Sequence, residues 1–227
     1  MTIEGRLQAV TDGLWVAETG LRFLGMPFSA RMTVAVLPGG LWLHSPVPLE
    51  PLKADLDRLG PVIWRVAPNL MHHLYQGPYQ AAYPDSRLAA PAELARKRPD
   101  LRIDQRLEDP LPAWDGAIEG RAIAGNKTLQ ETVFLHRDSR TLILTDTAVN
   151  IGPAEHWSLR LYARLNGCYD RLALSAMLKM LYRDRKAARA SLDAVLDLDF
   201  DRVIPAHGAI VASGGKDALA RAFAWLK

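Results

Sequence analysis

The sequence predicts an α/β sandwich in which the sheets lie inside and the helices outside. Short strand-forming runs occur in two groups along the chain, and each group is followed by helical segments. Hydrophobic residues make up 49% of the 227 residues, and a chain of this length buries enough surface to fold without disulfides or zinc. No shift in composition marks a boundary, so we expect residues 1–227 to form a single domain.

The first group of strands is expected at residues 14–17, 32–37, 41–44, 62–66 and 87–90. The turn Pro38-Gly39-Gly40 predicts a hairpin between the second and third of them. Leucines at helical spacing predict a helix over residues 50–59, and residues 93–97 form a short helical segment. Asn69 is suited to cap a helix or turn that opens at residues 70–75.

The second group of strands is expected at residues 117–118, 121–123, 131–136, 141–146 and 203–208. The run 141–146 is the clearest buried strand, and it ends on the carboxylate of Asp146. Helix-spaced Leu, Met and Ala predict helices at residues 159–165, 171–182, 184–196 and 217–226. Whether the stretch 159–196 covers a site as a lid or packs outside the sheet is open from the sequence.

Charge and cysteine content narrow the class of protein. A net charge of +3 spread over the whole chain gives little support for a nucleic-acid partner. The single Cys168 excludes an internal disulfide framework and fits a reducing compartment. Glu4 and Gln8 lie where a signal peptide has its apolar core, and no stretch approaches the roughly 18 apolar residues of a membrane helix. We therefore expect a cytoplasmic protein with a small-molecule ligand and no membrane; its oligomeric state is open.

Titratable side chains follow three of the expected strands. His72 and His73 come after the strand 62–66, Asp146 ends the strand 141–146, and His207 follows Val203-Ile204. Ligands of α/β proteins collect at strand ends, and imidazoles with a carboxylate are the usual ligands of zinc or non-haem iron. Purely structural roles are the alternative: a helix start for the histidine pair, a turn for Asp146 and a loop contact for His207.

Three segments resemble the metallo-β-lactamase superfamily. Residues 199–208, DFDRVIPAHG, are similar to its closing motif, where a strand of the form D-x-V-I-P-G-H-G delivers the last histidine ligand. Residues 141–146 resemble the strand that leads to its metal-bridging carboxylate, and residues 33–45 resemble its N-terminal hairpin. The resemblance spans nearly the whole chain and implies a four-layer αββα sandwich.

The chain departs from that superfamily at its first metal site. The superfamily signature H-x-H-x-D-H, with its last histidine placed on His73, falls on Pro68, Leu70, His72 and His73. The next histidine of the superfamily falls near Lys127. The resemblance therefore implies that the three-histidine site has lost its ligands.

The second site of the superfamily keeps a complete ligand set: His72, His73, Asp146 and His207. This implies one divalent metal ion, zinc or iron, with Asp146 also serving catalysis. Lys127 is expected to replace the lost cation as a fixed ammonium that stabilises an oxyanion. Glu131 and His44 are candidate acid/base groups or supports of the ligands.

Two functions follow from this resemblance. The first is a single-metal hydrolase of a small ester, thioester, lactone or phosphoester. The alternative is a non-catalytic binding protein built on a degenerate enzyme scaffold, with a vestigial site that holds no ion, because fold alone does not set function.

Overall fold

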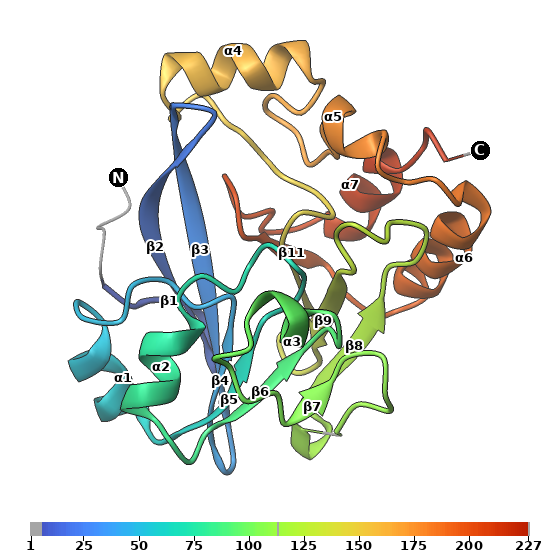
Figure 1. Cartoon of the computed structure of the whole chain (residues 1–227). Coiled ribbons are helices and arrows are strands. Elements are labelled where there is room, and N and C mark those ends of the chain that lie inside the picture. Colours follow the sequence, from blue (N-terminus) through green and yellow to red (C-terminus); the bar gives the residue numbers. More distant parts are fainter. Residues whose placement is uncertain (1–5, 113, 227) are drawn as a thin grey trace.

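The computed structural model describes residues 6–112 and 114–226, so Glu4 and the rest of residues 1–5, together with residues 113 and 227, lie outside the described part of the chain (Figure 1). Two β-sheets pack face to face, and helices cover the outer face of each. Within the described ranges, none of the helices has the length and apolar character that crossing a membrane requires.

The first sheet has seven strands in sequence order. These are β1 (Gln8–Thr11), β2 (Leu14–Phe23), β3 (Met26–Leu37), β4 (Gly40–His44), β5 (Val62–Val66), β6 (Arg87–Ala90) and β7 (Gln105–Arg106). Pairing is antiparallel from β1 to β4 and parallel from β4 to β7. The predicted hairpin is β3–β4, in which Leu37 pairs with Gly40. Gly40 has a φ of +137°, and a Cβ at this position would lie 2.3 Å from the backbone oxygen of Pro61, so only glycine fits this turn.

The second sheet has four strands in the order β11-β10-β9-β8. These are β8 (Ile118–Ala122), β9 (Thr132–His136), β10 (Thr141–Leu144) and β11 (Arg202–Pro205). β8, β9 and β10 are antiparallel, whereas β10 and β11 run parallel. The parallel pair is joined by a long crossover that holds the helices α4 to α6, as parallel strands require.

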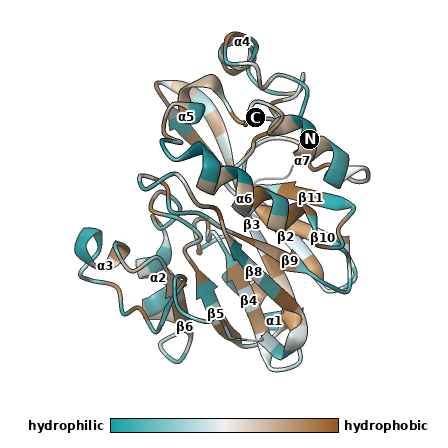
Figure 2. Cartoon of the chain, turned by 90° about the vertical axis from the view of Figure 1, so that its right-hand side faces the viewer, coloured by the Kyte–Doolittle hydropathy of each residue, from teal (hydrophilic) through white to brown (hydrophobic). Residues whose placement is uncertain are grey.

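The helices are α1 (Lys53–Leu59), α2 (Gln76–Ala82), α3 (Leu94–Lys97), α4 (Trp157–Leu165), α5 (Ala176–Lys179), α6 (Arg185–Leu196) and α7 (Gly215–Ala222), with the 3₁₀ turn η1 (Trp114–Gly116). Three apolar clusters separate the layers. Leu56 of α1 and Tyr79 of α2 pack on the outer face of the first sheet. Trp42 and Phe134 belong to the cluster between the sheets, and Leu192 of α6 lies in the cluster outside the second sheet. The apolar residues accordingly gather on the strands between the helix layers (Figure 2).

Two expectations about local structure are wrong. The helix predicted at residues 171–182 shrinks to α5, because Ala173 exchanges two backbone hydrogen bonds with Val149 and so extends the chain there. Strands β2 and β3 are longer than predicted and form one long hairpin that reaches towards α4 (Figure 1). Gly20 and Pro27 obscure this extension in the sequence, since both residues weaken strands.

Candidate metal centre

Asp146 and His207 are brought together by the register of two parallel strands. Leu144, the last residue of β10, pairs with Pro205, the last residue of β11. Asp146 and His207 each lie two residues beyond this pair, so both side chains emerge at the same edge of the second sheet. The expected meeting of strand ends is thus built into the pairing of β10 with β11.

His72 reaches the same edge from the first sheet. It lies in the turn between β5 and α2. The side chain of the buried Asn69 shapes this turn, because its Oδ1 accepts the backbone N–H groups of Met71 and His72, each at 2.8 Å. The predicted cap at Asn69 therefore exists, but it closes a turn ahead of α2 rather than the helix itself.

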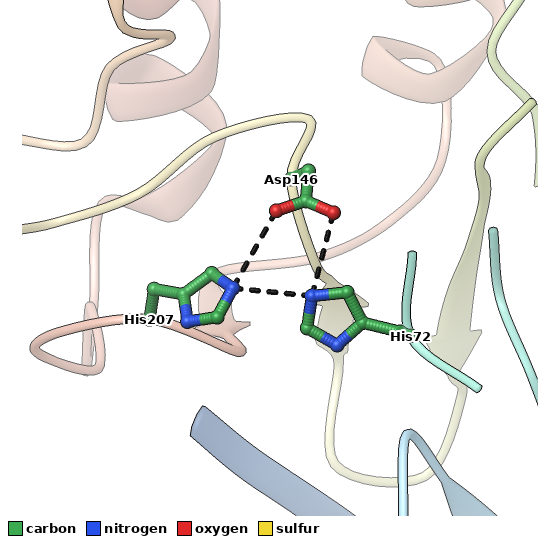
Figure 3. A group of neighbouring side chains, drawn as sticks. All are labelled: His72, Asp146 and His207. Atoms are coloured by element: carbon green, nitrogen blue, oxygen red, sulfur yellow. Dashed lines mark hydrogen bonds and ion pairs between the residues drawn. The ribbon is translucent and has the colours of Figure 1, made fainter. Parts of the chain in front are cut away.

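The three side chains point at one another (Figure 3). The Nε2 atoms of His72 and His207 are 3.1 Å apart. Asp146 offers Oδ2 to His72 at 3.3 Å and Oδ1 to His207 at 3.4 Å. Across residues 6–112 and 114–226, this is the one group of at least three His, Cys, Asp or Glu side chains close enough to share a metal ion.

The far sides of both imidazoles are held in place. His207 donates from Nδ1 to the carbonyl oxygen of Ser29 at 2.6 Å, so the neutral ring turns the lone pair of Nε2 towards the cluster. Nδ1 of His72 lies 2.7 Å from Oγ of Ser45, a hydroxyl that can accept a hydrogen bond from the Nδ1–H group. Phe28 stacks on the His207 ring, with centroids 4.3 Å apart. Such contacts orient histidine ligands of metals.

Glu131 and Asn69 fix the loop that carries Asp146. Glu131 is buried and accepts the backbone N–H groups of Thr145, Asp146 and Thr147 at 2.8–2.9 Å. The side-chain amide of Asn69 donates to Oδ2 of Asp146 and to Oγ1 of Thr145, each at 2.8 Å, and lies 3.3 Å from Glu131. Glu131 thus supports Asp146. The structure places it one contact away from the cluster, whereas the sequence analysis expected a catalytic role for it.

The charges of the cluster follow from these contacts. Burial opposes ionisation of Asp146, yet the neighbouring His72 and His207 rings hold the pKa of its carboxyl well below the usual range. Burial also works against a charged His72, but the carboxylates of Asp146 and Glu131 raise the pKa of this ring overall. Asp146 is therefore an anion with two imidazoles beside it, which is the donor set that a divalent cation prefers.

His73 does not join the cluster, so the expected set of four ligands is reduced to three. Arg98 donates from Nη1 to Nδ1 of His73 at 3.2 Å and to its carbonyl oxygen at 3.1 Å. Burial and the nearby cations of Lys97 and Arg98 lower the pKa of His73 to about 4. Side chains of neighbouring residues in a turn point in different directions. In the turn after Asn69, the side chain of His72 points to the sheet edge and that of His73 does not.

Lys127 and His44 also lie away from the cluster. Lys127 is exposed and lines a separate cavity of about 470 Å³ on the far side of Glu131, so its expected role as an oxyanion cation has no support in the geometry. His44 is buried between Trp42 and Phe134, and neither ring nitrogen has a hydrogen-bond partner among the described residues. Burial lowers the pKa of His44 to about 3, which leaves the ring neutral.

A cavity of about 250 Å³ opens onto the three side chains. The β2–β3 hairpin supplies one wall, and the loop after β10 with α4 and α5 supplies another. Tyr162, Ser175 and Met177 line it, whereas α6 packs outside the second sheet. The part of the stretch 159–196 up to α5 therefore covers the site, and the rest does not.

Arg31 is a residue of the candidate site that the sequence analysis missed. It is buried in β3 and donates to the carbonyl oxygens of Pro205 at 2.5 Å and Gly208 at 2.6 Å, on either side of His207. Its charge is balanced by Glu18 on β2. The sequence does hold a signal for this role, because an arginine within the apolar run 30–37 needs buried partners.

Comparisons with known proteins bear on the fold. No protein-family model matches the sequence, and no curated protein matches it. The structure is similar to a metallo-β-lactamase from Pontibacter korlensis, with a TM-score of 0.66 and 13% identity over 97% of both chains. It is also similar to the mono-zinc form of FIM-1 from Pseudomonas aeruginosa, with a TM-score of 0.66 and 12% identity over 98% of this chain and 96% of that one.

DIM-1 metallo-β-lactamase gives a TM-score of 0.65 with 15% identity, over 98% of this chain and all of that one. Identities this low show the fold and leave activity undetermined. The αββα sandwich expected from the sequence is confirmed by these neighbours and by the two packed sheets. The chain has the fold of the metallo-β-lactamase superfamily.

Proposed function

We propose that this protein is a hydrolase that uses one divalent metal ion, zinc or iron, held by His72, Asp146 and His207. The observation that carries the proposal is the spacing of the ligand atoms. Ligands bound at about 2.0–2.1 Å to a tetrahedral zinc ion lie about 3.3 Å from one another. The two imidazole Nε2 atoms are 3.1 Å apart, and the Asp146 carboxylate presents Oδ2 to one of them at 3.3 Å and Oδ1 to the other at 3.4 Å, so the three side chains already stand close to this spacing.

The surroundings of the three side chains favour the same interpretation. Nε2 of His207 presents a lone pair because Nδ1 donates to Ser29, and Asp146 is ionised at neutral pH because its pKa is depressed. All three residues line the cavity, so an ion held by them would be accessible from the space that a substrate would enter. An open fourth position distinguishes catalytic from structural metal sites.

A metal ion in this site supplies a Lewis acid that polarises a carbonyl or phosphoryl oxygen and acidifies water. The chain's own residues do the rest. Asn69 and Glu131 hold the Asp146 loop, and the apolar cavity wall excludes bulk water from the reacting group. Within the described ranges no second group of His, Cys, Asp or Glu side chains lies close enough to hold another ion, and the resemblance aligns the three missing histidines with Pro68, Leu70 and a position near Lys127. The proposal is therefore a single-metal enzyme.

Metal content tests the proposal directly. The protein is purified without a nickel column and analysed by mass spectrometry for zinc, iron and manganese. We expect about one ion per chain after loading, and less than about 0.2 in Asp146→Ala and His207→Ala. His156→Asn is the matched control: His156 is exposed and caps α4, and asparagine preserves that cap.

Activity completes the test. Loaded wild-type protein and His156→Asn are expected to hydrolyse p-nitrophenyl acetate, and the two cluster variants to lose this activity. Wild-type protein that takes up no ion, and that zinc, iron and manganese leave inactive, would rule out the hydrolase.

That negative outcome would favour the alternative, a non-catalytic binding protein. One observation supports it: the cluster also satisfies itself without an ion, since His72 lies within hydrogen-bond distance of His207 and 3.3 Å from Asp146. In that case the double variant His72→Ala/His207→Ala would still bind ligand in the cavity.

A further inference from the structure

The cavity above the cluster is apolar along nearly all of its walls. Its floor is formed by His72, Asp146 and His207. Its apolar lining residues include Leu21, Phe28, Ala30, Pro46, Leu129, Val149, Ile151 and Leu178. Phe28 carries this lining down to the floor, because its ring stacks directly on His207. A ligand that fills the cavity therefore exchanges water for hydrocarbon everywhere except at its reacting end.

Positive charge is scarce in the same cavity. Arg22 is the one lysine or arginine among the described lining residues, and its Nη1 already donates to the carbonyl oxygen of Gly25 at 3.1 Å within the β2–β3 turn. Sites that bind phosphoryl groups surround them with arginine, lysine or backbone N–H donors. Apart from the proposed ion, the cavity offers a single arginine that is already engaged, and this lack of further cationic side chains favours a substrate that is neutral near its reacting group.

The apolar surface continues out of the cavity mouth. Met71, Leu74 and Met177 line the cavity and are also exposed, with 56%, 60% and 39% of their surface open to solvent. Exposed apolar side chains that surround a pocket mark a binding surface. Two of them are methionines, whose flexible thioethers adapt to hydrocarbon of different shapes.

From these observations we propose that the substrate is a carboxylic ester, thioester or lactone with an extended apolar acyl or aryl group. This rests on the proposed function and selects within it: phosphoesters are not substrates. The acyl carbonyl lies at the cluster, and the apolar group runs past Phe28 to Leu74 and the two methionines. Hydrolysis adds one water across the acyl bond: an ester or thioester gives one carboxylic acid and one alcohol or thiol, and a lactone gives a single hydroxy acid.

The test is a chain-length series on zinc-loaded protein: p-nitrophenyl acetate, butanoate, hexanoate and octanoate, with p-nitrophenyl phosphate beside them. Each buried methylene is expected to raise kcat/KM by about three- to fourfold, from the transfer free energy of a CH₂ group. Octanoate should therefore exceed butanoate by roughly 80- to 250-fold if all of its extra methylenes are buried, and by about tenfold if only half of them are. The phosphate should not react. A flat or falling series, or turnover of the phosphate, overturns the inference while the hydrolase itself stands.

Leu74→Asp and Leu165→Asp form a matched pair of variants. Both leucines are exposed, at 60% and 78%, but only Leu74 lines the cavity, whereas Leu165 ends α4. We expect Leu74→Asp to lower the octanoate-to-acetate ratio of kcat/KM at least tenfold and Leu165→Asp to leave it unchanged. Equal ratios in the two variants would contradict the proposed path of the acyl group.

Binding to metal-free protein keeps the inference testable if no ester is hydrolysed. Calorimetry with 1-hexanol, 1-octanol and 1-decanol, which carry no charge, should show an affinity that rises with chain length and falls in Leu74→Asp but not in Leu165→Asp. That result supports the apolar occupant even if the hydrolase fails. Affinity that does not depend on chain length excludes the occupant.

Discussion

Glu131→Gln is expected to destabilise the protein and to weaken metal binding together. The carboxylate is buried and faces only donors: Oε1 accepts the N–H of Thr145, and Oε2 accepts the N–H groups of Asp146 and Thr147 and lies near the amide of Asn69. Glutamine keeps the shape of the side chain but replaces one acceptor with an NH₂ group. Whichever way the amide turns, that NH₂ meets at least one backbone N–H.

The magnitude follows from this count. A hydrogen bond to a charged group contributes about 1.5–3 kcal/mol, and a buried donor left without a partner costs about 1–3 kcal/mol. The favourable orientation of glutamine keeps Asp146 and Thr147 bonded and loses Thr145. Part of this loss is offset, because burial and then the charge of Asp146 raise the pKa of Glu131, so the buried anion is itself costly. We expect a net loss of about 2–3 kcal/mol in the free energy of unfolding.

Urea denaturation of metal-free protein measures this loss, and zinc titration measures the second effect. Glu108→Gln is the matched control, because the exposed Glu108 also accepts a backbone N–H, from Ala92, with both oxygens. That variant should unfold at the wild-type urea concentration. If Glu131→Gln were equally neutral, the support of the Asp146 loop by Glu131 would be refuted. Lower stability with unchanged zinc affinity would refute its link to the site.

Three further perturbations give separate tests. The folded state lowers the pKa of His44 from 6.5 to about 3 and so resists protonation of this ring. The free energy of unfolding should therefore fall as the pH drops below 6.5, by about 3 kcal/mol between pH 7 and pH 4. Urea denaturation of His44→Leu should show a smaller loss of stability over the same pH range. Gly208→Ala places a Cβ 2.0 Å from the backbone oxygen of Asn150 at a φ of +82°, so calorimetry should show a loss of at least about 2 kcal/mol. Arg31→Lys keeps the charge but loses the paired bonds around His207, and zinc titration should show roughly tenfold weaker binding.

Local patterns predicted the strands that position the site. The bounds of β5 and β6 agree with the runs 62–66 and 87–90, and Asp146 and His207 follow β10 and β11 as expected. These elements are short apolar runs closed by turn residues, so their structure depends on sequence nearby. The parallel pairing of β10 with β11 then brings the side chains of Asp146 and His207 to one edge of the sheet, independently of how the intervening helices pack.

The rest of the site depends on contacts that are distant in the sequence. The choice between His72 and His73 is made by the turn that Asn69 closes and by Arg98, which lies 25 residues beyond His73. Lys127 was assigned from alignment to the superfamily signature, and spacing alone does not reveal that it faces another cavity. The same reason explains why the helix expected at 171–182 is shortened to α5: the distant partner Val149 holds Ala173 in an extended conformation.

Holding the residues that support the cluster in place costs free energy of folding, and this cost bears on what the cluster does. Glu131 and Arg31 are buried charges, and Ser45, whose Oγ meets His72, holds a positive φ of 54° that non-glycine residues seldom adopt. An apolar ligand alone would be bound by the cavity walls and would need none of these groups. Their common effect is to hold two imidazoles and a carboxylate within 3.4 Å of one another. Two imidazoles and a carboxylate are the donor set of a divalent cation, so this arrangement supports the proposed metal-dependent hydrolase more than a binding protein that has lost its chemistry.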